Sequence, residues 1–279
     1  MSTNKTNTLS WAILFGGFLF LYLPIFILIV YSFNESRLVT VWAGFSTKWY
    51  GELFEDEQMM NAVWMSLKIA FLSASAAVAL GTLAAIALVR SGAFKGKTLF
   101  TGMITAPLVM PEVITGLSLL LLFVTLSQMI GWPSERGAMT IWIAHTTFNM
   151  AYVAVVVSAR LRELDQRLEE AAMDLGANKL QVFIYITLPI VAPALLAGWL
   201  LAFTLSLDDL VIASFVSGPG STTLPMVVFS SVRLGVSPKI NALATLLVLA
   251  VSVAAFIAWW IMRRNELQRQ KEIQSAYSK

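Results

Sequence analysis

Long apolar runs alternate with short polar segments along most of the chain. Six runs are long enough to cross a bilayer, because a spanning helix needs about 20 apolar residues. Pro107 and Pro111 lie inside the third run, so we expect that helix to be bent or broken near its middle. The pattern predicts an all-α integral membrane protein with six transmembrane helices. The runs cover residues 10–31, 61–89, 99–129, 139–159, 190–214 and 241–262.

The polar segments divide the chain. A short tail at 1–9 precedes the first membrane helix at 10–31, and no small-residue cleavage site follows that helix, which favours a retained anchor over a signal peptide. A loop at 32–60 separates it from a core of spans at 61–262, and a polar tail at 263–279 follows. The core contains an unusually polar stretch at 161–189.

That polar stretch reads as a helical hairpin. In its first half Leu164, Leu168, Ala171 and Leu175 recur at helical spacing and give an otherwise charged helix an apolar stripe. Gly176 suits the left-handed position that ends such a helix.

The second half of the hairpin has its own start and stop signals. Asn178 followed three residues later by Gln181 is typical of an N-cap pair. Pro189 is expected to interrupt the hydrogen bonding before the next span. The helix between them carries one apolar face, made of Leu180, Phe183, Ile184 and Leu188.

Composition excludes several classes of protein. The chain is 58% hydrophobic and 13% charged, whereas soluble domains carry about 25% charged residues. A net charge of +3 spread along the chain gives no nucleic-acid-binding patch. The absence of cysteine excludes thiolate metal sites and a cysteine nucleophile, and no metal site is expected. A single histidine, His145, argues against an intramembrane enzyme and is expected to be a hydrogen-bonded core residue.

Basic residues concentrate on one side of the predicted membrane. They lie at 90–97, in the hairpin segment at 160–179 and after residue 262, whereas the opposite loops hold fewer Lys and Arg. Positive charge favours the cytoplasmic side, which predicts that both termini and the hairpin are cytoplasmic.

Three carboxylates lie within predicted spans: Glu112, Asp208 and Asp209. A charge near the bilayer centre costs at least about 2.5–3.5 kcal/mol, so it normally faces a cavity or a partner. Adjacent residues of one helix point about 100° apart, so one aspartate would face a path and the other a neighbour. Either one could be the path residue, and Lys68 could instead pair with Glu112.

Two further residues are candidates for a cation path. Trp199 and Phe203 could add cation–π contacts, although packing explains aromatic residues at this spacing equally well. Together with Glu112, Asp208 and Asp209 they form the set of substrate-path candidates.

The hairpin also resembles a known motif. EAAMDLGANKLQVFIYITLP at 170–189 has the spacing of the EAA loop in inner-membrane permeases of bacterial ABC importers. Similarity extends to other segments, and within the family it is greatest to putrescine-transport permeases of polyamine importers. These segments are VTVWAGFSTKWYGEL at 39–53, APLVMPEVITGLSLLLLF at 106–123, SLDDLVIASFVSGPG at 206–220, TTLPM at 222–226 and NALAT at 241–245.

The resemblance implies an ABC type I importer permease fold in the bacterial inner membrane and a multi-subunit complex. Its other members would be a second, different permease chain, an ATPase dimer that binds the ATP, and a periplasmic polyamine-binding protein. Gly92–Thr98 looks like a phosphate-binding loop but has the wrong glycine spacing, so this chain itself needs no cofactor. The implied ATPase-coupling residues are Glu170, Ala171, Ala172, Gly176, Ala177, Leu180, Phe183, Ile186, Leu188 and Pro189.

Other transport functions remain as alternatives. The same kind of complex could carry spermidine or another small organic solute, although three intramembrane carboxylates argue against an anion. An ATP-independent channel or secondary transporter is a more distant alternative, because neither would need an EAA loop.

Overall fold

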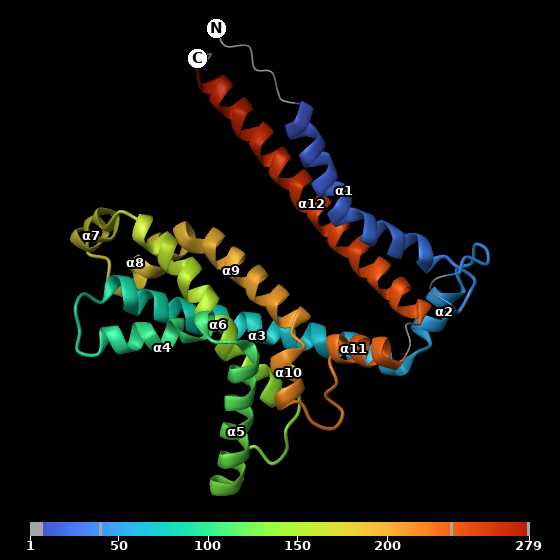
Figure 1. The fold of residues 1–279 in the computed structure, drawn as a ribbon. Helices are drawn as coiled ribbons and strands as arrows, with labels where there is room; N and C mark the ends of the chain where they lie inside the picture. Colours follow the sequence, from blue (N-terminus) through green and yellow to red (C-terminus); the bar gives the residue numbers. More distant parts are fainter. Residues whose placement is uncertain (1–7, 39–40, 235–236, 278–279) are drawn as a thin grey trace. The chain divides into compact units, whose positions relative to one another are not determined.

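The computed structural model describes residues 8–38, 41–234 and 237–277, and its named elements within these ranges are all helices (Figure 1). Six of them are long and apolar enough to cross a membrane. The prediction of an all-α protein with six membrane helices is confirmed. These spans are Ser10–Ser32, Glu57–Arg90, Glu112–Ile130, Ala138–Glu163, Lys179–Asp208 and Pro238–Ile257.

The chain forms two compact units, residues 1–57 with 231–279 and residues 58–230. In the first, α1 (Thr8–Ser32) and the short α2 (Lys48–Phe54) both pack on α12 (Pro238–Tyr277). The α12 helix continues to Tyr277, so the predicted tail at 263–279 is largely helical. Most of the predicted tail at 1–9 lies outside the described residues.

The interval at 32–60, expected as a loop, contains α2 and a folded turn around Asn34. The Asn34 side chain donates to the Val41 carbonyl at 2.7 Å and accepts from the Ala43 amide at 2.9 Å. The Trp49 indole donates to the Asn34 carbonyl at 2.6 Å and is 2% exposed. Trp49 is therefore a packing residue of this unit.

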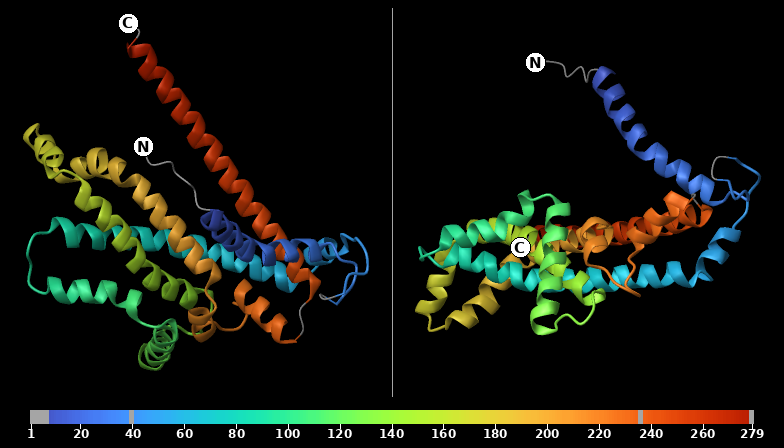
Figure 2. Two further views of the ribbon diagram at one scale, coloured as in Figure 1. Left: turned by 45° about the horizontal axis from the view of Figure 1, so that its top comes forward. Right: turned by 60° about the horizontal axis from the view of Figure 1, so that its bottom comes forward.

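The second unit is built on three long helices: α3 (Glu57–Arg90), α6 (Ala138–Glu163) and α9 (Leu188–Asp208). Small residues of α3 at Ala74, Ala77 and Ala85 pack with α6 and α9 in one buried cluster. Figure 2 shows α9 lying along α6, in agreement with their contacts. The small-residue stretch of α3 thus faces protein, because small side chains allow helices to approach closely.

The third predicted span, 99–129, is two helices. The first, α4, covers Lys97–Val109, and α5 covers Glu112–Ile130, with Met110 extended between them (φ −76°, ψ 135°). The cause is Pro111, because a residue before proline is driven out of the helical region. The expected break is confirmed and the single span is corrected.

The fifth predicted span, 190–214, is also corrected. Its helix ends at Asp208, Asp209 is extended, and α10 (Val211–Val216) follows before α11 (Leu224–Leu234). At the other end the helix continues through Pro189 instead of breaking there. A π-helical turn at Phe183–Thr187 lets the Leu188 amide bond to the Phe183 carbonyl, and this wider turn carries the chain past a residue without an N–H.

Gly81 gives a test of the close α3–α6 packing. A Cβ at this position would lie 2.8 Å from Val153 Cβ, so Gly81→Val should destabilise the chain by about 1–3 kcal/mol through overpacking. Thermal unfolding of the detergent-solubilised chain measures this. The matched control is Gly102→Ala in α4, where a Cβ meets nothing within 4 Å. Equal midpoints for the two variants would contradict the packing.

Candidate functional site: the polar hairpin and two helix breaks

The polar hairpin is formed by α7 (Gln166–Asp174), α8 (Lys179–Val182) and the π-helical turn η1 (Phe183–Thr187). Gly176 has φ +91°, its amide bonds to the Met173 carbonyl, and the Ala177 amide bonds to the Ala172 carbonyl. This is a Schellman motif, which satisfies carbonyls at the end of α7. The predicted left-handed glycine is confirmed.

The second helix of the hairpin begins with the predicted cap. The Asn178 side chain accepts from the Gln181 amide at 2.9 Å, and the Gln181 side chain accepts from the Asn178 amide at 2.8 Å. These reciprocal bonds fix the turn between the helices without any contact to another part of the chain. The turn between the two hairpin helices is therefore determined locally.

Large apolar side chains stand out from this hairpin. Leu175 is 90% exposed, Tyr185 76% and Leu180 67%, values that are unusual outside a membrane or an interface. Leu164 differs from the prediction, because it ends α6 and is buried. Of the predicted coupling residues, Glu170, Ala171, Gly176, Leu180 and Pro189 are exposed, and Ala172, Ala177, Phe183, Ile186 and Leu188 are half-buried.

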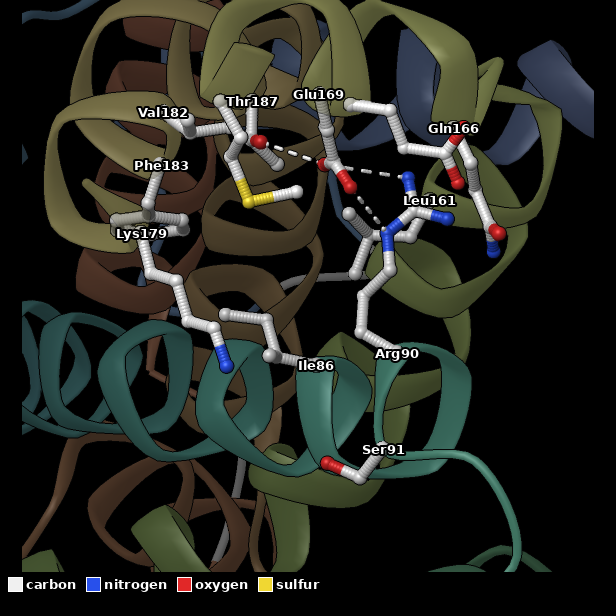
Figure 3. A pocket seen from close by; sticks show the side chains of 12 residues that line it. Ile86, Arg90, Ser91, Leu161, Gln166, Glu169, Lys179, Val182, Phe183 and Thr187 are labelled. Carbon is white, nitrogen blue, oxygen red and sulfur yellow. Dashed lines mark hydrogen bonds and ion pairs between the residues drawn. The ribbon is translucent and has the colours of Figure 1, made fainter. Parts of the chain in front are cut away.

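A charged contact ties the hairpin to α3. The Glu169 carboxylate lies 3.2 Å from Arg90 Nε and accepts from the Thr187 hydroxyl at 2.7 Å (Figure 3). Beside it is a cavity of about 420 Å³ between α3 and the hairpin, lined among others by Ile86, Met173 and Lys179. The Arg90–Glu169 contact was not predicted from the sequence. Nothing in one sequence pairs residue 90 with residue 169.

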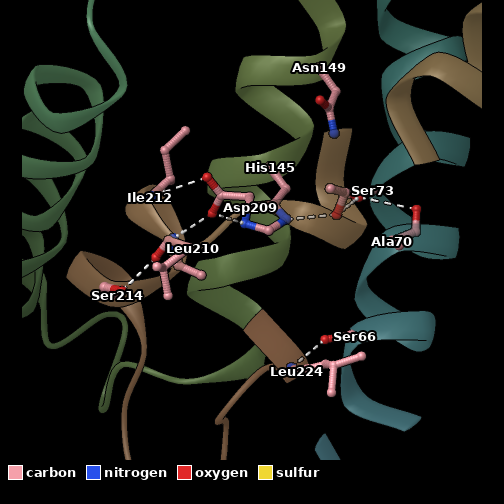
Figure 4. Close-up of polar contacts among 12 residues, drawn as sticks. Ser66, Ala70, Ser73, His145, Asn149, Asp209, Leu210, Ile212, Ser214 and Leu224 are labelled. Carbon is pink, nitrogen blue, oxygen red and sulfur yellow. Dashed lines mark hydrogen bonds and ion pairs between the residues drawn. The ribbon is translucent and has the colours of Figure 1, made fainter. Parts of the chain in front are cut away.

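The second functional region is the break between α9 and α10. Asp209 accepts from the Ile212 amide at 3.2 Å and the Ala213 amide at 2.7 Å, and so caps α10. Its carboxylate also lies 3.1 Å from His145 Nε2 (Figure 4). With its side chain 9% exposed, Asp209 is fully engaged within the chain.

His145 extends this contact into a buried chain of polar groups. Its Nδ1 lies 2.7 Å from the Ser206 hydroxyl, which in turn lies 3.0 Å from the Ser73 hydroxyl of α3 (Figure 4). His145 is 2% exposed, so the expectation of a hydrogen-bonded core residue is confirmed. The network joins α3, α6, α9 and α10.

Ser206, His145 and Asp209 contain the groups of a catalytic triad, but their environment does not suit one. The Ser206 side chain is 5% exposed and is enclosed between Ser73 and His145. A triad serine must reach a substrate carbonyl beside oxyanion donors. The network therefore positions helices.

Asp208 and Glu112 lie differently. Asp208 is the last residue of α9 and Glu112 the first of α5, and both side chains are exposed. The helix α5, which begins with Glu112, packs on α10, which begins shortly after Asp208 and Asp209. The alternative pairing of Glu112 with Lys68 is not found, because among the described residues no cation lies within 4.0 Å of Glu112.

The aromatic candidates form a packed cluster. Trp199 stacks on Phe203 with ring centres 5.2 Å apart and meets the edge of Phe71 at 5.6 Å. The Trp199 indole donates to the Ser75 hydroxyl at 3.1 Å. These contacts hold α9 against α3.

Comparison with known proteins now decides the family. Residues 77–268 match the model of the binding-protein-dependent transport system inner membrane component family, which is more than half of the chain. The chain belongs to this family. It is a multi-pass permease component of an inner-membrane importer, and is not an enzyme.

Individual relatives agree with this family. The chain is 67% identical to the putrescine transport system permease protein PotI of Escherichia coli K12 over 264 residues, covering 95% of this chain and 94% of that protein. It is 42% identical to the spermidine/putrescine transport system permease protein PotC of the same strain, covering 90% and 94%.

Solved structures share the fold. One is a bacterial ABC transporter involved in the import of the acidic polysaccharide alginate, with a TM-score of 0.68, 16% identity and coverage of 95% of this chain and 98% of that one. The MetNI methionine ABC transporter in an inward-facing conformation has a TM-score of 0.58, 20% identity and coverage of 75% and 98%. The expected ABC importer permease fold is confirmed.

The buried network predicts a stability defect. His145→Ala removes one partner from the buried Ser206 hydroxyl and one from the Asp209 carboxylate, and losing partners of buried polar groups costs about 1–3 kcal/mol. The unfolding midpoint of the solubilised chain should fall accordingly. Thr147→Ala on the same helix, whose exposed hydroxyl bonds only to its own helix at Ile143, should change it little. An unchanged unfolding midpoint in His145→Ala would contradict a stabilising role for the buried network.

Proposed function

We propose that this chain is the permease subunit through which an ATP-driven importer carries putrescine across the inner membrane. The observation that carries the proposal is the 67% identity to the putrescine permease PotI along nearly its whole length. Identity to the spermidine/putrescine permease PotC is lower, at 42%, which favours putrescine as the main substrate over spermidine.

The hairpin docks on a cytoplasmic ATPase in this proposal. Its apolar side chains at Leu175, Leu180 and Tyr185 are largely exposed at the end of two capped helices. Such side chains fit an apolar groove, and the caps hold them in place before docking, so little conformational entropy is lost on binding. ATP would be bound and hydrolysed by that partner.

Asp208 and Glu112 receive the cationic substrate. Both are exposed at helix ends within membrane segments and neither has a cationic partner within 4.0 Å among the described residues. The C-terminal carbonyls of α9 add negative character beside Asp208. A diamine has an ammonium at each end, and charge-assisted hydrogen bonds to carboxylates are roughly twice as strong as neutral ones. Asp209 is already engaged by His145 and α10, and it stabilises the break between α9 and α10.

The complete importer contains further subunits. A second permease chain, an ATPase dimer and a periplasmic polyamine-binding protein would complete it, as family membership implies. Both termini would lie in the cytoplasm, supported by the basic residues near the hairpin and after residue 262.

Uptake of labelled putrescine tests the substrate assignment. In proteoliposomes with the complete complex, Asp208→Asn should lower ATP-dependent uptake at least about tenfold, because charged hydrogen bonds contribute about 1.5–3 kcal/mol. The unfolding midpoint should stay unchanged, whereas Asp209→Asn should lower both uptake and midpoint. The control is Glu135→Gln, an exposed carboxylate in the turn before α6.

Two results of this experiment would overturn the assignment. Normal putrescine uptake by both aspartate variants would show that the carboxylates of Asp208 and Asp209 are not needed in the transport path. Uptake of spermidine alone by the unsubstituted complex would keep the transport class and reject putrescine as the main substrate.

Co-purification of the ATPase tests docking. Leu175→Asp and Leu180→Asp should each weaken ATPase binding about tenfold or more, because burying a leucine contributes about 1.5–3 kcal/mol. Leu38→Asp, exposed at 64% in the turn before α2, is the control. Retention of the ATPase by both hairpin variants would contradict docking through this surface.

A further inference from the structure

We propose that the Arg90–Glu169 ion pair is the mechanical link by which movement of the hairpin reaches α3 and, through α3, the helix breaks. Arg90 and Glu169 are then positioning residues for transport. The inference deepens the proposed ATPase coupling and rests on it.

The contact has the geometry of a specific link. Arg90 ends α3, and its guanidinium lies 3.2 Å from one Glu169 oxygen and donates from a terminal nitrogen to the other at 3.3 Å. Thr187 donates to the same carboxylate at 2.7 Å. One carboxylate therefore joins α3, the first hairpin helix and the turn that leads into α9.

The environment makes this pair stronger than an ordinary surface pair. The two side chains are 16% and 17% exposed, and partly buried pairs are screened by salt much less than exposed ones. The adjoining cavity of about 420 Å³ lies between the hairpin and the last turn of α3, where Ile86 and Arg90 line it. Figure 3 shows the ion pair reaching from α3 to the hairpin beside this cavity.

The hairpin is also connected to the rest of the unit through the backbone at both of its ends. It is continuous with α6 before it and with α9 after it. Movement can therefore reach those helices through the backbone. The helix α3 is far away in sequence, and although it packs on α6 and α9, the Arg90–Glu169 pair joins it to the hairpin directly.

The helix α3 is suited to carry that movement inward. It has 34 residues without an internal proline, about 50 Å at 1.5 Å per residue. Further along, its Ser73 hydroxyl meets Ser206 at 3.0 Å and its Ser66 hydroxyl accepts from the Leu224 amide at 2.7 Å. Ser206 contacts His145, which holds Asp209. A displacement of Arg90 therefore acts on the helix break beside Asp208.

The test is the number of putrescine molecules transported per ATP hydrolysed by the complete complex in proteoliposomes. Glu169→Gln and Arg90→Gln should each lower this ratio roughly 3- to 10-fold, within the range of coupling changes seen for residues along such networks. The ATPase should still co-purify, because the apolar docking side chains are unchanged. The charge exchange Arg90→Glu with Glu169→Arg should restore much of the ratio.

The matched control is Glu163→Gln. Glu163 also pairs with an arginine, Arg160 at 2.9 Å, but both belong to one helix, so this pair links no separate elements. An unchanged ratio in Glu169→Gln would overturn the proposal, and so would a charge exchange no better than either single variant. Loss of the ATPase from Glu169→Gln would also overturn it, because the residue would then act in docking. A wild-type complex without putrescine uptake would instead reject the proposed function.

Discussion

Inside a bilayer every backbone N–H and C=O must find its partner within the protein, because hydrocarbon offers none. Long helices meet this requirement by themselves, and they make up most of the described chain. Each place where a helix stops inside the apolar region therefore needs compensating polar groups. At the α9–α10 break Asp209 supplies them, by accepting from the Ile212 and Ala213 amides. The polar groups around the α9–α10 break follow from this constraint.

The two broken helices bring their acidic residues together. The Met110–Pro111 break starts α5 with Glu112, and the Asp208–Asp209 break ends α9, while α5 packs on α10. Breaks of this kind are where transporters bind ions and charged substrates, since irregular backbone survives only against protein or water. In this chain His145 binds Asp209, whereas Asp208 is exposed.

Sequence predicted best what is determined locally. Hydrophobic runs fixed the number of membrane helices, and the Gly176 and Asn178–Gln181 signals gave the hairpin turn in detail, because both depend on residues a few positions apart. Helix ends inside apolar runs were harder. The pattern places Asp208 and Asp209 in one helix, but the helix ends between them, where Asp209 accepts from the Ile212 and Ala213 amides and contacts His145.

Long-range contacts could not be predicted from the sequence. Neither Arg90–Glu169 nor Ser73–Ser206 leaves a periodic trace in one sequence, since each joins residues of distant elements. The predicted interruption at Pro189 was wrong for a related reason. The helix continues through Pro189 because of the π-helical turn at Phe183–Thr187, which the sequence pattern does not predict.

The proposed transport path depends on Asp208 and Glu112 receiving an ammonium group at the helix breaks. A high-resolution structure of the complete complex, trapped with putrescine between its two open states, tests it most directly. We expect a putrescine nitrogen within about 3.2 Å of an oxygen of Asp208 or Glu112, with Asp209 still in contact with His145. Putrescine elsewhere, with both carboxylates paired to basic residues of the second permease chain, would contradict it.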